Sequence, residues 1–116
     1  MKYVVAIIRP NLLDDLRQGL GEIGIIAMTV SEIGGYGRQK GHSEIYRGSE
    51  YHSDMNAKVK VEIALPDVML ERTIEVIREI ASTRTIGDGK VFVMDLASAT
   101  RLRTGETGES ALGQAV

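Results

Sequence analysis

A glycine turn that ends in a lysine, Gly87-Asp88-Gly89-Lys90, leads directly into an apolar stretch and could bind phosphate. Glycines let backbone N–H groups approach an anion closely, and the lysine adds a point charge. The same four residues also suit a plain turn, so by themselves they leave both interpretations open.

Two further clusters offer cations of the same kind. Residues 35–41, Gly-Tyr-Gly-Arg-Gln-Lys-Gly, combine three glycines with two basic side chains. Arg101 and Arg103 are two residues apart, so on an extended segment their guanidinium groups project from one side and could clamp a triphosphate. Alone, this pair would be interpreted as a solvated tail. Together the clusters supply Arg38, Lys90, Arg101 and Arg103 for a polyanion.

The overall charge favours a small anionic ligand over a nucleic acid. The 116 residues include 14 basic and 16 acidic side chains, whereas a nucleic-acid-binding surface needs a basic excess. Cysteine is absent, which excludes thiol chemistry. No stretch is long enough for a membrane-spanning helix, and the apolar N-terminus ends at Arg9-Pro10, too early for a secretory signal. We therefore expect a cytoplasmic protein without direct membrane insertion.

Other chemistries find little support. Gly19–Gly24 matches G-x-G-x-x-G, but it ends a predicted helix, whereas dinucleotide binding needs the start of one. The two histidines, His42 and His52, both fall in a predicted loop. Without cysteine they make a poor metal site, and they cannot support a Ser-His-Asp arrangement.

The elements that position the three clusters follow from the hydrophobic pattern. Residues 3–8 form an apolar run, residues 58–65 alternate, and residues 25–33 and 91–96 are also predicted strands. One helix is predicted from Pro10-Asn11 to Gly24, with Asn11 as its N-cap. A second starts at Pro66-Asp67, with Asp67 as its N-cap, and its apolar stripe runs from Leu70 to Ala81.

This order, β-α-β followed by a long loop and a second β-α-β, predicts one α+β domain with a ferredoxin-like double βαβ fold. Loops as long as residues 34–57 are usually functional. Both helices of such a fold pack on one face of the sheet, yet the first and last strands are apolar on both faces. We expect another subunit to cover the second face. The alternative is a moderately apolar face that stays in water.

The same clusters lie in stretches that closely resemble the nitrogen-regulatory PII signal-transduction proteins. Residues 36–51 resemble the T-loop signature of the family, residues 83–93 its second signature, and residues 101–106 its C-terminal stretch. The resemblance implies a homotrimer with one PII-like domain over residues 1–108. It places the T-loop at about 37–57, between the second and third strands, the B-loop at about 82–90 and the C-terminal loop at about 101–108, before a flexible tail at 109–116.

The resemblance also implies a site for ATP or ADP in each cleft between neighbouring subunits. The glycine turn would hold the phosphates, the base of the T-loop would close over them, and the C-terminal arginines would reach in from the adjacent subunit. Adenine and ribose would lie near the second and third strands. The implied nucleotide-binding residues are Thr29, Gly35, Gly37, Arg38, Gln39, Glu62, Ala64, Gly87, Asp88, Gly89, Lys90, Arg101 and Arg103.

A second effector, 2-oxoglutarate, is implied to bind with Mg-ATP. Mg²⁺ bridges the two ligands in the family, and Gln39 matches its protein ligand. Lys58 matches the lysine that pairs with a carboxylate of 2-oxoglutarate, although by type alone it is equally a charged residue at a strand start. The implied set is Gln39, Lys40, Gly41, Lys58 and Gly87.

The T-loop would carry the output. Tyr51 matches the uridylylation site, Ser49 a phosphorylation site, and Arg47 the arginine that plugs ammonium channels. Implied targets are an ammonium channel, which would recruit the protein to the membrane, a glutamine synthetase modifying enzyme, a sensor kinase linked to transcription, and a biosynthetic kinase. Residues 52–57 are less apolar than in many relatives, which bears on the choice of partner.

Three functions follow from these observations. The first is a regulator, not an enzyme, that reports nitrogen and carbon status through the T-loop. The second is a small nucleotide-binding enzyme on the same fold, such as a phosphohydrolase or phosphoryl-transfer catalyst, but no general base accompanies the cations. The third is an oligomeric scaffold in which the glycine clusters are only turns.

Overall fold

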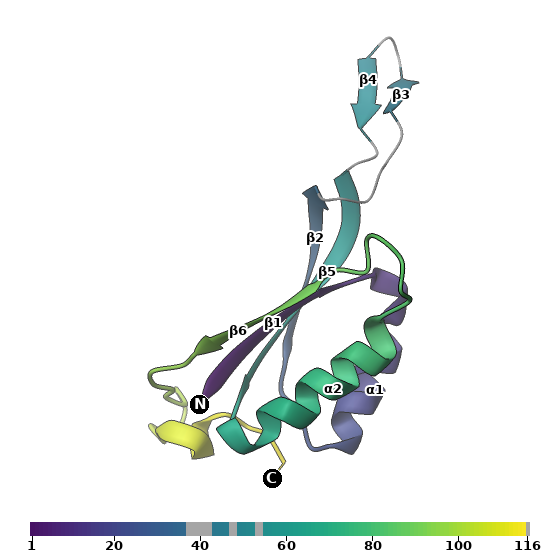
Figure 1. Ribbon diagram of the computed structural model, residues 1–116. Helices are drawn as coiled ribbons and strands as arrows, with labels where there is room; N and C mark the ends of the chain where they lie inside the picture. The colour runs from purple at the N-terminus through teal and green to yellow at the C-terminus, as the bar shows by residue number, and fades with distance from the viewer. Residues whose placement is uncertain (37–42, 47–48, 53–54, 116) are drawn as a thin grey trace.

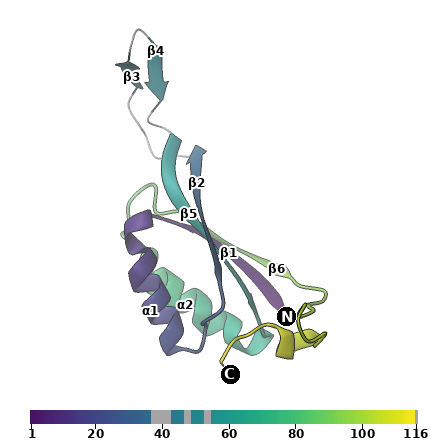
Figure 2. The ribbon, with the colours of Figure 1, turned by 180° about the vertical axis from the view of Figure 1, so that it is seen from behind.

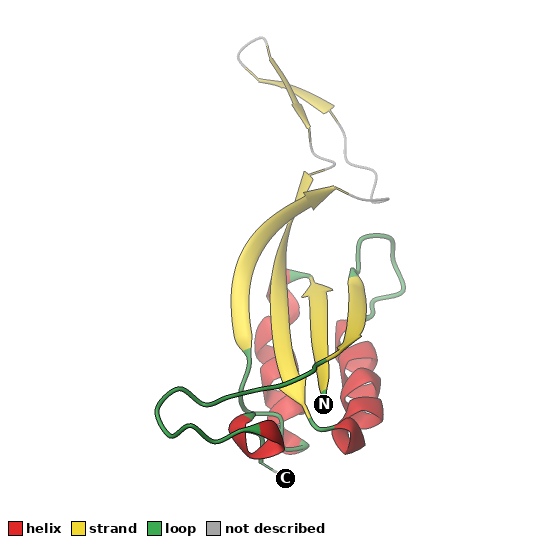
Figure 3. Cartoon of the chain, turned by 90° about the vertical axis from the view of Figure 1, so that its left-hand side faces the viewer, coloured by secondary structure: helices red, strands yellow, loops and turns green. Residues whose placement is uncertain are grey.

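The chain folds into a four-stranded sheet with two helices on one face, and a separate two-stranded hairpin lies beyond the sheet (Figures 1 and 3). The computed structural model describes residues 1–36, 43–46, 49–52 and 55–115. The strands are β1 Lys2–Ile8, β2 Thr29–Tyr36, β3 Ser43–Tyr46, β4 Ser49–His52, β5 Met55–Leu65 and β6 Lys90–Asp95, and the helices are α1 Leu13–Glu22 and α2 Leu70–Ala81.

The sheet has the order β2-β5-β1-β6, and every neighbouring pair is antiparallel. This is the order of a double βαβ unit, so the predicted α+β ferredoxin-like class is confirmed. The core lies between this sheet and the helices. Its largest fully buried side chains are Ile8, Leu16, Leu20, Ile25, Ile63, Leu65, Ile77, Val4, Val61 and Thr73.

Both helices begin later than the sequence predicted. Each is preceded by a short 3-10 turn, Pro10–Leu12 or Asp67–Met69, so the N-caps are Leu12 and Met69. The N-cap roles predicted for Asn11 and Asp67 were therefore wrong. Proline fits the first position of such a turn because it has no N–H to satisfy, and the Asp67 carboxylate instead pairs with the N-terminal ammonium group at 2.9 Å.

The predicted end of the first helix is confirmed. Gly24 follows the last turn of α1 with a φ of +92°, a left-handed conformation that glycine adopts without strain. The next residues do not pair with β5 as the predicted strand over residues 25–33 required. The β2–β5 ladder starts only where Thr29 lies opposite Glu62.

At their other ends β2 and β5 extend further than predicted. The ladder continues to Tyr36 opposite Met55, and the two strands rise together above the rest of the sheet (Figure 1). Beyond them β3 and β4 pair with each other, Ser43 opposite His52 and Tyr46 opposite Ser49. The stretch predicted as one long irregular loop therefore contains strand structure in its described residues.

The face of the sheet opposite the helices is apolar around β1 and β6. Tyr3, Val5 and Ile7 of β1 are only partly buried there. Phe92 and Met94, opposite Val5 and Tyr3 on β6, are 50% and 46% exposed. In Figure 3 the sheet lies in front of the helices, and among the described residues only the loop after β6 crosses in front of its lower end. This matches the pattern from which self-association was predicted.

Among the residues that the structure describes, no helix has the length and apolar character needed to cross a membrane.

Candidate functional site

The glycine turn before β6 is held in shape by a carboxylate. Asp88 accepts hydrogen bonds from the backbone N–H groups of Thr83 and Thr85 at 2.7 and 3.2 Å, and from the Thr83 hydroxyl. Arg9, at the end of β1, donates to Asp88 through Nε at 3.1 Å and to the Ile86 carbonyl oxygen at 3.0 Å. These contacts tie the turn to the end of the central strand.

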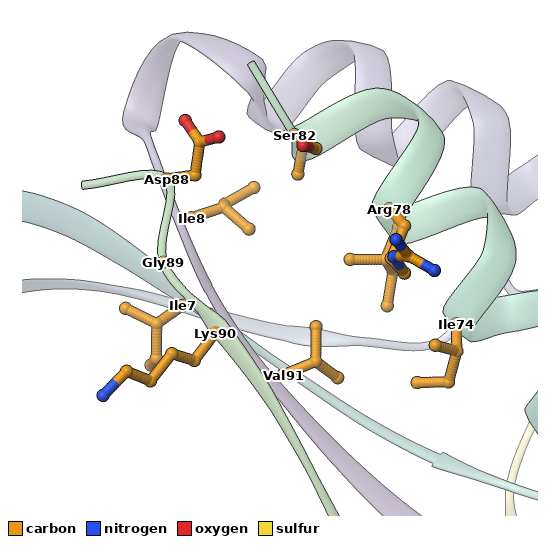
Figure 4. Close-up of a pocket in the computed structure, with 11 residues that line it drawn as sticks. Ile7, Ile8, Ile74, Arg78, Ser82, Asp88, Gly89, Lys90 and Val91 are labelled. Atoms are coloured by element: carbon orange, nitrogen blue, oxygen red, sulfur yellow. The ribbon is translucent and has the colours of Figure 1, made fainter. Parts of the chain in front are cut away.

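The turn can present backbone N–H groups because of this support. Gly87 and Gly89 have φ angles of +98° and +106°, and Arg84 also has a positive φ of 62°. Successive amides in such conformations form concave surfaces that suit anions. Lys90 follows with an exposed side chain, which extends away from α2 in Figure 4. The arrangement favours an anion at the turn.

The structure gives the carboxylate of Asp88 a supporting role in the turn. Asp88 was predicted among the nucleotide contacts, which stays a prediction, and within this chain its carboxylate bonds to the loop and to Arg9. The hydroxyl of Thr83, the guanidinium of Arg9 and the backbone bonds together hold the pKa of Asp88 well below its usual range. Arg9 is a site residue that the sequence analysis missed, because an arginine before Pro10 belongs to no recognisable pattern.

We predict that Asp88→Asn weakens the fold at neutral pH by about 2 kcal/mol, because it removes bonds to a charged acceptor in a half-buried setting. The folded-state pKa of Asp88 lies below the unfolded value, so its contribution is complete above about pH 4 and is lost as the pH falls through the folded-state pKa. Urea denaturation at a series of pH values measures this difference.

The control for this prediction is Asp95→Asn. Lys2 also lowers the pKa of Asp95, but the Asp95 side chain is 87% exposed and water screens the pair. Its replacement should change the unfolding free energy little at any pH. Equal losses for the two variants would contradict the role assigned to Asp88.

A second cation stands near the turn. Lys58 is half-buried on β5, and burial, with a further contribution from the charge of Arg9, lowers its pKa, while Asp88 acts in the opposite sense. Lys60 follows two residues later on the same face of the strand. The end of the sheet that carries the glycine turn is thus positively charged and partly shielded from water.

A cavity of about 390 Å³ lies between α2 and β6 beside the turn (Figure 4). Most of its wall is apolar, from Ile74 and Ile77 on α2 and Val91 on β6, and Arg78 and Ser82 add polar groups. None of the residues predicted to contact adenine lines it. It adjoins the glycine turn through Asp88, Gly89 and Lys90.

The residues predicted near adenine and ribose gather elsewhere. Thr29 and Glu62 are opposite each other where the β2–β5 ladder begins. The Tyr3 hydroxyl donates to the Glu62 carboxylate at 3.0 Å, and burial, followed by this contact, raises the pKa of Tyr3. Ala64 lies two residues further on, and its carbonyl oxygen accepts a bond from Gln114 at 2.9 Å.

The C-terminal loop corrects one step of the sequence argument. Residues 102–104 form a turn, closed by a 2.8 Å bond from Gly105 N–H to the Arg101 carbonyl oxygen, so Arg101 and Arg103 are not on an extended segment. The Arg101 guanidinium contacts Glu106 at 3.4 Å and donates to the Ser110 carbonyl oxygen at 3.2 Å. Arg103 is exposed.

The C-terminal residues also differ from the flexible tail that was predicted over residues 109–116. Residues Gly108–Ala111 form a 3-10 turn and Leu112 is buried. Ala115 donates to the Gly24 carbonyl oxygen at 2.8 Å. Residues 108–115 therefore pack against the body of the domain (Figure 2).

Within one chain the two groups of predicted nucleotide residues do not converge. Thr29 begins β2 at one edge of the sheet and Lys90 begins β6 at the other, with β5 and β1 between them. The three strand spacings between β2 and β6 correspond to about 14 Å. The distance between Thr29 and Lys90 is larger, because the two residues also lie at different heights along the strands. The two groups are therefore well separated within one chain.

The remaining predicted residues belong to β2, to β4 or to the part of the chain that the structure does not describe. Gly35 is on β2 opposite Asn56, while Ser49 and Tyr51 are on β4 opposite Tyr46 and Glu44. Five others and the channel arginine fall outside the described residues: Gly37, Arg38, Gln39, Lys40, Gly41 and Arg47. No cluster of three or more metal-binding His, Cys, Asp or Glu side chains occurs in the part of the chain that the structure describes.

Comparison with known proteins identifies the family. The sequence profile described as "Nitrogen regulatory protein P-II" matches residues 1–106. The chain belongs to this family. It is 51% identical over 112 residues to "Nitrogen regulatory protein P-II 1" of Escherichia coli strain K12, a match that covers 97% of this chain and all of the relative. The P-II protein of Pasteurella multocida strain Pm70 is 52% identical with the same coverage.

The P-II profile covers both groups of predicted site residues, from β1 to Glu106. These relatives are named regulatory proteins, which agrees with the expectation of a regulator rather than an enzyme. They are matched over their whole length by 112 of the 116 residues of this chain.

Proposed function

We propose that this chain is a signal transducer of nitrogen and carbon status that binds ATP or ADP and, with Mg-ATP, 2-oxoglutarate. Membership of the P-II family supports regulation in nitrogen metabolism. The observation that carries the ligand proposal is the glycine turn at residues 87–90. Hydrogen bonds between Asp88, Arg9 and the loop fix the shape of this turn, which contains two glycines with positive φ and ends at the exposed Lys90. That arrangement suits the phosphates of a nucleotide.

The nucleotide would bind between two copies of the chain. Two observations support this: Thr29 and Lys90 lie on strands at opposite edges of the sheet, and on the apolar face Tyr3 is only partly buried and Phe92 is 50% exposed. A homotrimer would bring the β2 edge of one subunit to the β6 edge of the next. Arg103, exposed on its turn, would reach the phosphates of the neighbouring site, and Arg101 would first have to exchange its contact with Glu106.

The cationic end of the sheet fits a second acidic ligand. Lys58 is partly desolvated beside Arg9, and a dicarboxylate there would relieve the unfavourable proximity of the two cations. Mg²⁺ prefers oxygen ligands and is often held mainly by its substrates, so a single protein ligand such as Gln39 would be enough. Together these residues would make 2-oxoglutarate binding depend on Mg-ATP.

The output would pass through the T-loop, whose β3–β4 hairpin extends away from the sheet (Figure 1). Tyr51 is proposed as a uridylylation site, with Ser49 as a phosphorylation site, and Arg47 as the contact with an ammonium channel. Other proposed targets are a glutamine synthetase modifying enzyme and a sensor kinase. The protein would act in the cytoplasm and reach the membrane only through a channel, with ligands shifting the conformations of the loop.

Titration calorimetry tests the proposal directly. We expect ATP and ADP to bind, and 2-oxoglutarate to bind only when Mg-ATP is present, without rapid nucleotide turnover. Rapid hydrolysis would instead indicate a nucleotide-binding enzyme on this fold. A protein that gave no heat with any of these ligands at millimolar concentration would be a scaffold, and the proposal would be wrong.

A further inference from the structure

The side chain of Gln114 fills a gap in the sheet at the point where β2 and β5 separate. Its Oε1 accepts hydrogen bonds from the N–H groups of Ile26 and Ala27 at 2.9 and 3.0 Å. Its Nε2 donates to the carbonyl oxygens of Ala27 and Ala64 at 2.8 and 2.9 Å. One carboxamide thus satisfies four backbone groups that the β2–β5 ladder leaves unpaired.

This backbone cradle, formed by Ile26, Ala27 and Ala64, adjoins the residues proposed to hold the base. Thr29 follows Ala27 by two positions and lies opposite Glu62, and Ala64 belongs to both groups. A carboxamide presents one acceptor and one NH₂ donor side by side. Adenine presents the same pair, an acceptor ring nitrogen beside its exocyclic amino group. Gln114 therefore makes with the cradle the kind of contacts that an adenine would make.

The rest of the C-terminal segment holds Gln114 in this position. Leu112 is buried, and Ala115 donates to the Gly24 carbonyl oxygen at 2.8 Å. Arg101, which is proposed to contact phosphate, donates to Ser110 in the same segment. Ser110 precedes Leu112, so this contact can remain when the residues after Leu112 leave the cradle.

We infer that Gln114 is an internal competitor for the base-binding part of the nucleotide site, so that nucleotide binding displaces the C-terminal segment. The inference rests on the proposed function, because it names a regulator of the same site. An internal competitor that occupies the cradle in about nine of ten molecules lowers the apparent affinity about tenfold. It also makes exposure of residues 113–115 a signal of nucleotide occupancy.

The test compares the full-length protein with Gln114→Ala and with a chain that ends at Leu112. Both variants should bind ADP up to about tenfold more tightly than the full-length protein. Inorganic tripolyphosphate, which has no base, should bind all three proteins equally. In the full-length protein, ADP should speed removal of the last residues by a carboxypeptidase. Gln18→Ala, which replaces an exposed glutamine on α1, is the matched control and should behave as the full-length protein does.

The outcomes separate the two proposals. If the full-length protein binds ADP but neither variant binds it more tightly, the C-terminal segment supports the fold and does not compete, and this inference is overturned. Tighter binding of tripolyphosphate as well would also overturn it, because the effect would then not concern the base. If none of the proteins binds ADP, the proposed function itself is wrong.

Discussion

Replacement of Lys58 by alanine should abolish 2-oxoglutarate binding in the presence of Mg-ATP while most ATP binding remains. The side chain is half-buried on β5, and burial, with a further contribution from Arg9, lowers its pKa, while Asp88 acts in the opposite sense. A carboxylate placed beside it would gain a charge-assisted bond in a partly dry setting. Such bonds contribute roughly 1.5–3 kcal/mol, so the affinity should fall at least about tenfold.

The matched control is Lys60→Ala, on the same strand and the same face. Lys60 lies opposite Ser31 and Ile7, one step nearer the middle of the sheet. The variant loses the same charge, so a general electrostatic effect on an anionic ligand would appear in both proteins. Calorimetry with 2-oxoglutarate at saturating Mg-ATP should show loss for Lys58→Ala and retention for Lys60→Ala.

A companion variant, Gln39→Ala, tests the proposed Mg²⁺ ligand in the same experiment. It should also lose 2-oxoglutarate binding and keep most ATP binding. Unchanged 2-oxoglutarate affinity in both the Lys58 and Gln39 variants would remove the assignment of this pocket. Loss of ATP binding in the Lys58 variant would mean that Lys58 belongs to the nucleotide site instead.

The fold could be predicted from sequence because its signals are local and periodic. The apolar run over residues 3–8 and the alternation over residues 58–65 became the two central strands, β1 and β5. The stop at Gly24 depends on a backbone conformation that glycine favours. The helix starts were misjudged because Asn11 and Asp67 are good N-caps by type, but each lies within a 3-10 turn that begins at or beside a proline.

The site was predictable only as a list of separate clusters. The glycine turn was evident from its four residues, but the role of Asp88 depends on Arg9, which lies 79 positions away in the sequence. The position of Gln114 depends in the same way on Ala27 and Ala64, 87 and 50 positions away. Such contacts are set by the packing of distant segments, and neither residue type nor spacing indicates them.

The prediction that Arg101 and Arg103 project from one side failed because it assumed the wrong backbone conformation. Residues two apart share a face only on an extended backbone, and the prediction assumed one. The bond from Gly105 N–H to the Arg101 carbonyl oxygen closes a turn instead, with Gly105 at a φ of +77°. The glycine was visible in the sequence, and a glycine shortly after a charged pair was the signal that a turn could replace the strand.

Gly89→Ala should severely damage the glycine turn at residues 87–90. Gly89 has a φ of +106°, and a Cβ placed on it would lie 1.8 Å from the carbonyl oxygen of Ile7. That oxygen belongs to the backbone of the central strand β1, so it cannot move aside as a flexible side chain could. Relief requires the turn to shift away from β1, which would disturb the amides next to Lys90.

The variant Gly105→Ala measures the cost of a positive φ without a steric clash. Gly105 also has a positive φ, +77°, but a Cβ there would meet no atom within 4 Å among the described residues. Gly105→Ala should therefore cost only the conformational strain, about 1–2 kcal/mol. Gly89→Ala should cost several kcal/mol, because the same kind of strain is added to a collision with main-chain atoms.

Urea denaturation at one fixed protein concentration measures both costs, which matters because an oligomer gains apparent stability with concentration. Nucleotide binding adds a second readout. If the turn holds phosphate, Gly89→Ala should lose ATP binding even under conditions where the variant remains folded, whereas Gly105→Ala should retain it. A folded Gly89→Ala protein with unchanged ATP affinity would mean that the close approach of the turn to β1 serves only the fold and that the phosphates are bound elsewhere.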